Sequence, residues 1–216
     1  VRKGDSIRVF VELTSQINGS DTPQLVEDNL LFHLESGVEQ KVNLRAWSWD
    51  AVLYDSLRVS KNTTIASSKP VVVRRGIRVD SAATLSILSP TVLYFGSTAG
   101  IDVYGTLEIS GQPGQDVVLR GDRLDNMFDY LPYDRVSGQW RGIHFFGSSS
   151  GNSLRYLDLH SAMDAILCDS VDICDTPNLS LANVTIHNCK GYGLAAFHSN
   201  ISMANTLISD TLADCL

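Results

Sequence analysis

The sequence predicts an all-β protein: a right-handed parallel β-helix over residues 76–216, preceded by a small, incomplete immunoglobulin-like β-sandwich in residues 1–75. A repeat carries the first part of this prediction, because Asn178–Asn183 (NLSLAN) recurs as Asn200–Asn205 (NISMAN), 22 residues later. Within each copy apolar and polar residues alternate, which is the period of a strand rather than of a helix. One such strand cannot bury its apolar face alone, so the repetition predicts successive coils stacked in parallel.

The repeat also predicts which residues of neighbouring coils lie side by side. Further matched positions are Tyr156–His160 with Asn183–His187, Ile186 with Ile208, and Asn188 with Asp210. We expect Asn183 and Asn205 to lie on adjacent coils with their side-chain amides hydrogen-bonded, as in stacked amide ladders. In the same register His160 stacks on His187.

A second series of short apolar segments extends the pattern toward the N-terminus. Its members are Gly142–Phe145, Ala165–Cys168 and Gly193–Ala196, and further upstream Gly76–Val79 with Gly100–Val103 and Thr84–Ile87 with Thr106–Ile109. A leucine-rich repeat, the rival architecture, needs its own consensus and a helical segment in each repeat, and neither is present. Because Cys215 and Leu216 occupy the point where earlier coils open a new strand, we expect the β-helix to be truncated at its C-terminus.

Residues 1–75 lack this repeat but contain candidate strands. These are Ser6–Leu13, Asn29–Leu34, Gln40–Ala46, Ala51–Val59 and Val71–Arg74. The segments Lys3–Glu12, Asn29–Leu34 and Lys41–Arg45 resemble the closing half of an immunoglobulin-like domain of the kind found in bacterial surface proteins and in the ASPM–SPD-2–Hydin group. Such domains have about seven strands. Three or four strands here would leave the sandwich incomplete.

Residues 99–144 carry a more specific resemblance. The segments are Ala99–Leu107 (AGIDVYGTL), Leu119–Arg123 (LRGDR), Asp125–Arg135 (DNMFDYLPYDR) and Gly138–His144 (GQWRGIH). They resemble a family of right-handed β-helix surface lipoproteins of Gram-negative gut bacteria, and the resemblance extends over essentially the whole chain. It implies export to the outer cell surface, a lipid anchor outside this chain and further β-helix coils downstream. It implies no established activity, so no functional residue is carried over.

Composition excludes several functions. The net charge is −7 and only 19% of residues are charged, whereas nucleic-acid binding requires clustered Lys and Arg. The longest basic run is Arg74-Arg75. The four cysteines, Cys168, Cys174, Cys189 and Cys215, lack the paired spacing of a zinc site. Cys168 is expected to be a buried thiol, and a small loop closed by Cys168 and Cys174 is the alternative to free thiols. We therefore expect no nucleic-acid partner, no cofactor and no metal.

Residues 121–139 interrupt the β-helix with a mostly polar insertion, and long loops on rigid scaffolds often carry function. The candidate ligand-binding residues there and beside it are Arg123, Asp125, Tyr130, Tyr133, Asp134, Arg135 and Trp140. The insertion is expected to protrude from the stack.

Two other interpretations of the insertion remain open. Oxygen ligands at Asp122, Asp125 and Asp129 could hold calcium, although no known calcium-loop spacing is present. Alternatively, the loop is purely structural. In that case the apolar residues Met127, Phe128 and Leu131 would fix it to the β-helix wall while its Asp and Arg residues pair internally.

A further acidic group lies on the strands and turns of the later coils: Asp158, His160, Asp164 and Asp169. A β-helix polysaccharide lyase or glycoside hydrolase needs clustered acids in a groove. The paired acidic motifs of polygalacturonases are absent, and we favour the interpretation that these are ordinary solvated turn residues. No catalytic residue is assigned.

Two functions follow from these observations. The leading hypothesis is a non-enzymatic extracellular or cell-surface scaffold that binds a polysaccharide or a surface protein through one β-helix face or the insertion. The alternative is a β-helix polysaccharide lyase or glycoside hydrolase.

Overall fold

A computed structural model describes residues 6, 8–14, 17, 19–171 and 176–215. It divides the chain into two compact units, residues 1–50 and residues 51–216. The architecture is all-β apart from one short 3-10 helix among the described residues, which confirms the predicted fold class. No helix in this part of the chain is long and apolar enough to cross a membrane.

The first unit contains a β-hairpin. β1 (Gln24–His33) pairs antiparallel with β2 (Glu39–Ser48), and these strands include two of the expected segments. The expected strand over Ser6–Leu13 is not formed by its described residues. The hairpin alone does not make a sandwich, and the immunoglobulin-like domain therefore remains a prediction.

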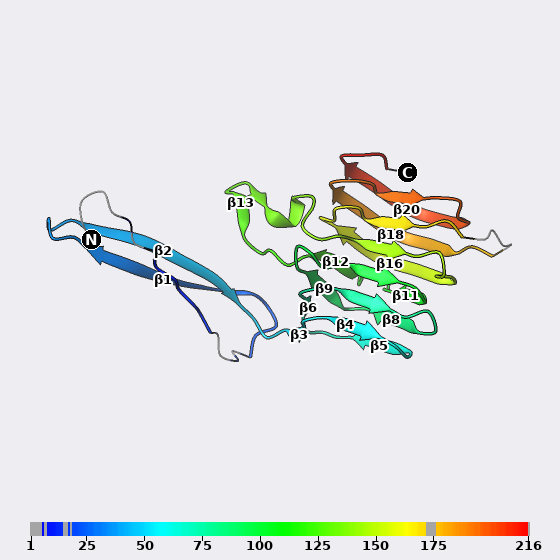
Figure 1. The fold of residues 1–216 in the computed structure, drawn as a ribbon, viewed down its shortest axis with the longest axis horizontal. Coiled ribbons are helices and arrows are strands. Elements are labelled where there is room, and N and C mark those ends of the chain that lie inside the picture. The colour runs from blue at the N-terminus through cyan, green and yellow to red at the C-terminus, as the bar shows by residue number, and fades with distance from the viewer. Residues whose placement is uncertain (1–5, 7, 15–16, 18, 172–175, 216) are drawn as a thin grey trace. The chain divides into compact units, whose positions relative to one another are not determined.

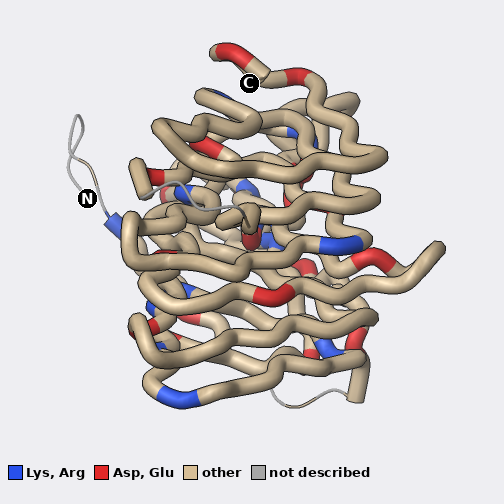
Figure 2. The backbone as a smooth tube through the Cα atoms, turned by 90° about the vertical axis from the view of Figure 1, so that its right-hand side faces the viewer, with Lys and Arg blue, Asp and Glu red and all other residues tan. Residues whose placement is uncertain are grey.

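The second unit is a parallel β-helix with three walls (Figures 1 and 2). The first wall contains β4 (Leu57–Val59), β7 (Ile77–Val79), β10 (Ile101–Val103), β15 (Ile143–Phe145), β17 (Ile166–Cys168) and β19 (Leu194–Ala196). The second wall begins with β5 (Thr63–Ala66), β8 (Thr84–Leu88) and β11 (Thr106–Ser110), and the third with β3 (Val52–Tyr54), β6 (Val71–Val73), β9 (Val92–Phe95) and β12 (Val117–Gly121). Neighbouring strands within each wall are parallel.

Three long strands join the second and third walls: β16 (Asn152–His160), β18 (Leu179–Cys189) and β20 (Ile201–Thr211). The first half of β16 pairs with β11 and its second half pairs with β12. In the earlier coil residues 111–116 separate these two walls, whereas in β16 the single residue Tyr156 turns the corner with φ +50°. The later coils are therefore the more regular ones, which is why the repeat is clearest there.

The predicted asparagine ladder is confirmed at these corners. Asn183 and Asn205 follow Tyr156 in the same register, with φ +56° and +49°. Asparagine adopts this left-handed conformation more readily than most residues. The Asn205 side-chain amide donates a hydrogen bond to Asn183 Oδ1, and Ile186 lies beside Ile208 as expected. The asparagines of this repeat thus have a structural role.

The β-helix begins at Val52 rather than at residue 76. β3, β4, β5 and β6 pair in parallel with the strands of the following coil, so they belong to the β-helix and not to an N-terminal sandwich. The expected strand Ala51–Val59 is in fact two strands on different walls.

The core fills the space between the walls. In the coils between the first and the last, alternate strand residues point inward and are almost fully buried, among them Leu85, Ile101 and Leu119. Trp140 is 1% exposed and stacks on Phe95 with ring centroids 4.4 Å apart. Its indole N–H donates to the carbonyl of His160 over 2.8 Å. Trp140 is therefore part of the core rather than of a surface site.

The insertion forms a small hairpin, β13 (Asn126–Phe128) with β14 (Leu131–Pro132), and the 3-10 helix η1 (Tyr133–Arg135) (Figure 1). The expectation that apolar residues fix it to the wall is wrong for Met127 and Phe128, whose side chains are about half exposed. Polar contacts do this instead: Ser161 Oγ donates to the carbonyl of Asp134, and the Gln139 N–H donates to the carbonyl of Ser161.

Candidate functional site

A column of outward-facing side chains crosses the third wall. Arg120 on β12, His160 on β16 and His187 on β18 occupy equivalent positions on successive coils, because each follows an inward-facing Leu or Ile in paired strands. The Arg120 guanidinium carbon lies 5.1 Å from the centre of the Tyr94 ring on β9. His160 and His187 stack with ring centroids 4.7 Å apart, as the sequence predicted.

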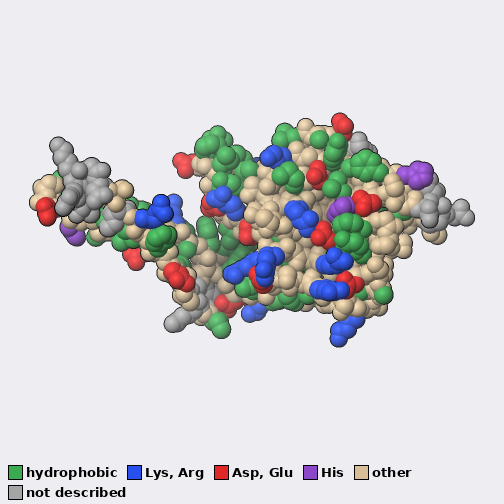
Figure 3. Space-filling view, in the orientation of Figure 1, with side chains coloured by type: hydrophobic (Ala, Val, Ile, Leu, Met, Phe, Trp, Pro, Cys, Tyr) green, Lys and Arg blue, Asp and Glu red, His purple; other side chains and the backbone are tan. Residues whose placement is uncertain are grey.

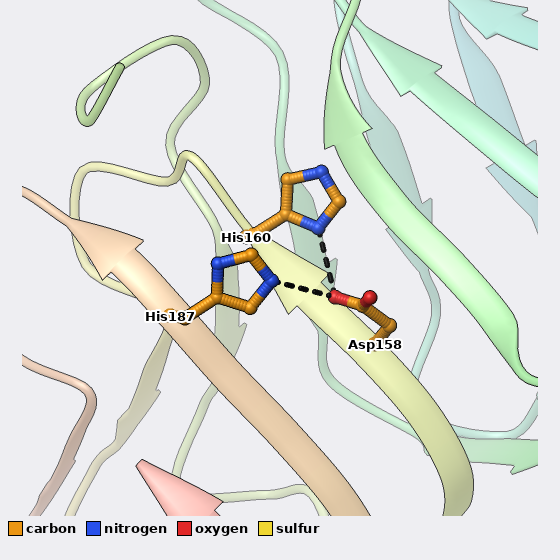
Figure 4. A group of neighbouring side chains, drawn as sticks. All are labelled: Asp158, His160 and His187. Atoms are coloured by element: carbon orange, nitrogen blue, oxygen red, sulfur yellow. Dashed lines mark hydrogen bonds and ion pairs between the residues drawn. The ribbon is translucent and has the colours of Figure 1, made fainter. Parts of the chain in front are cut away.

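Asp158 joins the two histidines (Figure 4). Its Oδ1 lies 2.8 Å from His160 Nδ1 and 3.2 Å from His187 Nε2. Asp158 lies two residues before His160 on β16, so both side chains leave the same face of the strand. The side chain of His160 is 7% exposed, that of His187 26% and that of Asp158 33%, so the group opens to solvent on the side of His187 and Asp158.

Each imidazole has a second partner on its other nitrogen. His160 Nε2 lies 2.9 Å from Asp134 Oδ1, and His187 Nδ1 lies 2.6 Å from Asn188 Oδ1. Asp134 in turn receives Arg120 Nη1 at 2.7 Å. Asp134 therefore attaches the insertion to the third wall. Each of the two imidazole rings is held in its orientation by two hydrogen-bond partners.

The cluster stabilises its charged forms. Burial alone would raise the pKa of Asp158, but hydrogen bonds from His160 and His187 lower it well below its usual value. Burial opposes protonation of His160, yet Asp134 and Asp158 raise its pKa overall. The hydrogen bond to Asp158 raises the pKa of His187, and that from His160 lowers the pKa of Asp134. Two carboxylates and two imidazoles in contact can relay a proton or bind a divalent metal ion.

The first wall carries a second concentration of functional groups. Arg58, Arg78 and Asp102 are in register on its outer face. Arg58 Nε lies 2.9 Å from Asp80 Oδ2, and Arg78 Nε lies 3.3 Å from Asp80 Oδ1. The hydrogen bond from Arg58 contributes most to lowering the pKa of Asp80, and Arg78 adds to it.

Beside these pairs is a row of stacked side chains. The Arg78 guanidinium carbon lies 4.2 Å from the Tyr104 ring centre, Tyr104 stacks on Phe146 at 4.1 Å, and Phe146 stacks on His144 at 4.0 Å. His144 Nε2 lies 2.8 Å from Asp169 Oδ1. Because the rings lie face to face, they present mainly their edges outward.

A hollow of about 270 Å³ adjoins this row. Arginines dominate its charged lining, which comprises Arg58, Arg75, Arg78, Arg141 and Asp102. Arg141 binds both carboxylate oxygens of Asp102 at 3.1 Å, and Arg75 pairs with Asp55. Figure 3 shows that basic side chains on the visible face of the β-helix have acidic ones beside them.

Another hollow, of about 440 Å³, lies over the left-handed corners. Asn183 and Asn205 line it together with Tyr156 and Asp116. Its single charged residue is the acid Asp116, so it offers hydroxyl and amide groups but no cation to a ligand.

The candidate residues of the insertion fall into separate places. Arg123 binds Asp125, and its guanidinium carbon lies 3.4 Å from the Tyr133 ring centre, so these three residues pair internally as the structural interpretation expected. Tyr130 is 82% exposed at the tip, and Arg135 is exposed on η1.

Only Asp134 of the predicted ligand-binding group reaches the histidine cluster. Of the acids suggested for an enzyme, Asp158 belongs to this cluster, whereas Asp169 contacts His144 on the first wall. Asp164 accepts the Tyr192 N–H at 2.9 Å and supports a turn. Cys168 and Cys189 are buried free thiols and Cys215 is exposed; a Cys168–Cys174 loop involves a residue outside the described ones.

Sequence reasoning missed several residues of both sites. Arg120 lies near the end of a strand whose outward positions carry no repeat signal. The four arginines of the first wall are spread along the sequence from Arg58 to Arg141. The β-helix register was the only available signal for either group.

No protein-family model, curated protein or solved structure matches this chain. Its fold and its two polar surface groups define it as a parallel β-helix protein, an architecture that serves both binding modules and enzymes.

Proposed function

We propose that this chain is a binding module of a cell-surface β-helix protein and that it takes an acidic polysaccharide along the first wall. The observation that carries the proposal is the hollow lined by Arg58, Arg75, Arg78 and Arg141. An extended sugar chain suits the outer face of a wall whose strands repeat in register.

The chemistry of arginine supports an acidic ligand. A guanidinium has five N–H donors in a planar fork that matches carboxylate and sulfate groups. Arg141 Nη2 contacts both carboxylate oxygens of Asp102 and Nε donates to the carbonyl of Thr98, so Nη1 of the same guanidinium keeps its donors for a ligand. The side chains of Arg58, Arg75, Arg78 and Arg141 are about half to three-quarters exposed, so they can reach one.

The local charge also favours this site. The chain as a whole has a net charge of −7 and would repel an acidic polymer. Around the hollow, four arginines face the carboxylates of Asp55, Asp80 and Asp102, which leaves an excess of positive charge. An acidic chain is therefore directed to the first wall rather than to other faces.

Binding is tested by affinity electrophoresis and calorimetry with soluble polygalacturonate and alginate, and with dextran as the neutral polymer. We expect an acidic polymer in the gel to retard the protein. We expect the affinity for that polymer to be at least about tenfold lower in Arg78→Ala and in Arg141→Ala. Arg155→Ala is the matched control, because Arg155 is an exposed arginine on the second wall. Equal binding of dextran, or equal loss in all three variants, would contradict the proposal.

The enzymatic alternative is favoured by one observation, the contact of His160 with the carboxylates of Asp134 and Asp158. Assays for reducing ends and for unsaturated products on the same polymers test it. Turnover that disappears in Asp158→Asn would replace the binding-module proposal with an enzyme. Placement at the outer cell surface, with a lipid anchor outside this chain, is part of the proposal and rests on the family resemblance.

A further inference from the structure

We propose that Asp158, His160 and His187 form a binding site for one divalent transition-metal ion, with Zn²⁺ as its preferred occupant. The ligand atoms are Asp158 Oδ1, His160 Nδ1 and His187 Nε2, which lie within 4.8 Å of one another. This site is on the third wall and is separate from the arginine hollow of the first wall. The metal-site proposal is therefore independent of the proposed polysaccharide binding.

Two of the three separations between these atoms are close to those around a tetrahedral ion. Zinc binds imidazole nitrogen and carboxylate oxygen at about 2.0–2.1 Å, which places two ligands of one ion about 3.3 Å apart. Asp158 Oδ1 lies 2.8 Å from the His160 nitrogen and 3.2 Å from the His187 nitrogen. The two imidazole nitrogens lie within 4.8 Å of each other, so side-chain rotation must also bring them to about 3.3 Å apart before all three atoms bind one ion. Figure 4 shows that both rings turn one nitrogen toward the same oxygen.

The outer partners of the two rings provide an independent argument. Histidines that bind a metal typically donate their other ring N–H to a carboxylate or carbonyl oxygen, which fixes the tautomer. His160 Nε2 faces the Asp134 carboxylate at 2.9 Å, and His187 Nδ1 faces Asn188 Oδ1 at 2.6 Å. Arg120 holds Asp134 in place at 2.7 Å. Both imidazoles are thus oriented with one nitrogen available for an ion.

The ligand types select the metal class. Two imidazoles and one carboxylate suit Zn²⁺ and its neighbours in the first transition series, whereas Ca²⁺ and Mg²⁺ require mostly oxygen ligands. Three protein ligands leave a fourth position, and the partial exposure of Asp158 and His187 lets water or a ligand occupy it. His160 contacts Asp134, and Asp134 lies in η1 of the insertion. An ion bound by His160 would therefore also influence the position of η1.

The test uses the tag-free chain, stripped with EDTA and titrated with Zn²⁺ in a calorimeter. We expect one ion per chain for the unaltered protein and at least about tenfold weaker binding in His187→Gln and in Asp158→Asn. His144→Gln is the control, since His144 also pairs with one aspartate but, among the described residues, belongs to no group of three possible metal ligands. Circular dichroism of the EDTA-treated variants establishes whether each is folded. Because two ligand variants are used, the test remains valid if one of them does not fold.

Co²⁺ absorption provides the second readout. Nitrogen and oxygen ligation gives weak visible bands without the intense thiolate charge-transfer band that binding at cysteine would produce. Absence of saturable Zn²⁺ binding in the unaltered protein would overturn the proposal. So would a thiolate band, or affinity that is unchanged in both ligand variants. Ca²⁺ binding of equal strength would overturn the assignment to a transition metal.

Discussion

His160 lies face to face with His187 on the next coil, their ring planes inclined by only 18°. Two imidazoles of raised pKa in contact would repel each other if both were charged and unpaired. Asp158 between them and Asp134 beyond His160 provide the compensating negative charge. The stacking is therefore maintained by carboxylates, and its stability depends on pH.

In metal-free protein we expect the cluster to stabilise the fold most between about pH 4 and about pH 6.5. The folded-state pKa of His160 is raised from 6.5, so its contribution is complete below about pH 6.5 and is lost as pH rises through the raised pKa. The pKa of Asp158 is lowered from 3.8, so its contribution is present above about pH 4 and is lost as pH falls through the lowered pKa. Urea unfolding in the presence of EDTA gives the unfolding free energy at each pH, and the pH dependence is compared between the unaltered protein and His160→Gln. If the unfolding free energy of His160→Gln changed with pH in the same way as that of the unaltered protein, the prediction would be contradicted.

The asparagine ladder has a direction, because Asn205 donates and Asn183 accepts. Asn183→Asp keeps the acceptor and the tolerance for φ +56°, so we expect little change in unfolding free energy. Asn205→Asp replaces the donor with a carboxylate facing an oxygen, and we expect a loss of about 1 kcal/mol. Chemical denaturation of both variants decides between this direction and the reverse one, in which the two effects would be exchanged.

Gly142 is required where the chain enters the first wall. Its φ is +98°, and a Cβ there would lie 1.7 Å from the carbonyl oxygen of Asp164 on the next coil. We expect Gly142→Ala to cost more than about 3 kcal/mol, because the coils would have to separate. Gly114→Ala is the control: its φ is +76° but no heavy atom lies within 4 Å, so only the conformational penalty of about 1 kcal/mol applies. Similar melting temperatures for the two variants would refute the stacking at Gly142.

The buried thiols should resist alkylation. Burial raises the pKa of Cys168 to about 12 and that of Cys189 to about 11, so neither is appreciably ionised near neutral pH. Cys215 is exposed. With iodoacetamide and peptide mass spectrometry, we expect Cys215 to be labelled in the folded protein and the other two only after denaturation. Rapid labelling of Cys168 would mean that the β-helix opens there.

The later coils were predictable because their corners are single residues. The NLSLAN repeat aligned the two asparagines, and the match of Tyr156–His160 with Asn183–His187 placed His160 beside His187; the structure confirms both. The first coils were missed, since the connections between β3, β4, β5 and β6 differ in length from one to the next. A repeat is clearest where both the strands and the corners have constant length.

The cluster around His160 was predictable only in part. Register places Asp158, His160 and His187 on one face, but the contribution of Asp134 depends on the path of the insertion across the wall. A single sequence does not predict which residues of the wall a loop of that length contacts. The preference for polar rather than apolar attachment was likewise not visible, because Met127 and Phe128 are apolar residues that stay exposed.

The insertion leaves the strands around it in register: Val117 still lies beside Leu157 and Ile143 beside Ile101. A coil can thus lengthen at a corner without altering its neighbours, since the closure entropy of a loop grows only slowly with its length. Residues 124–132 are consequently an exchangeable segment. A foreign peptide grafted there, with Asp134 retained as its anchor, would be displayed at a defined position on a rigid support.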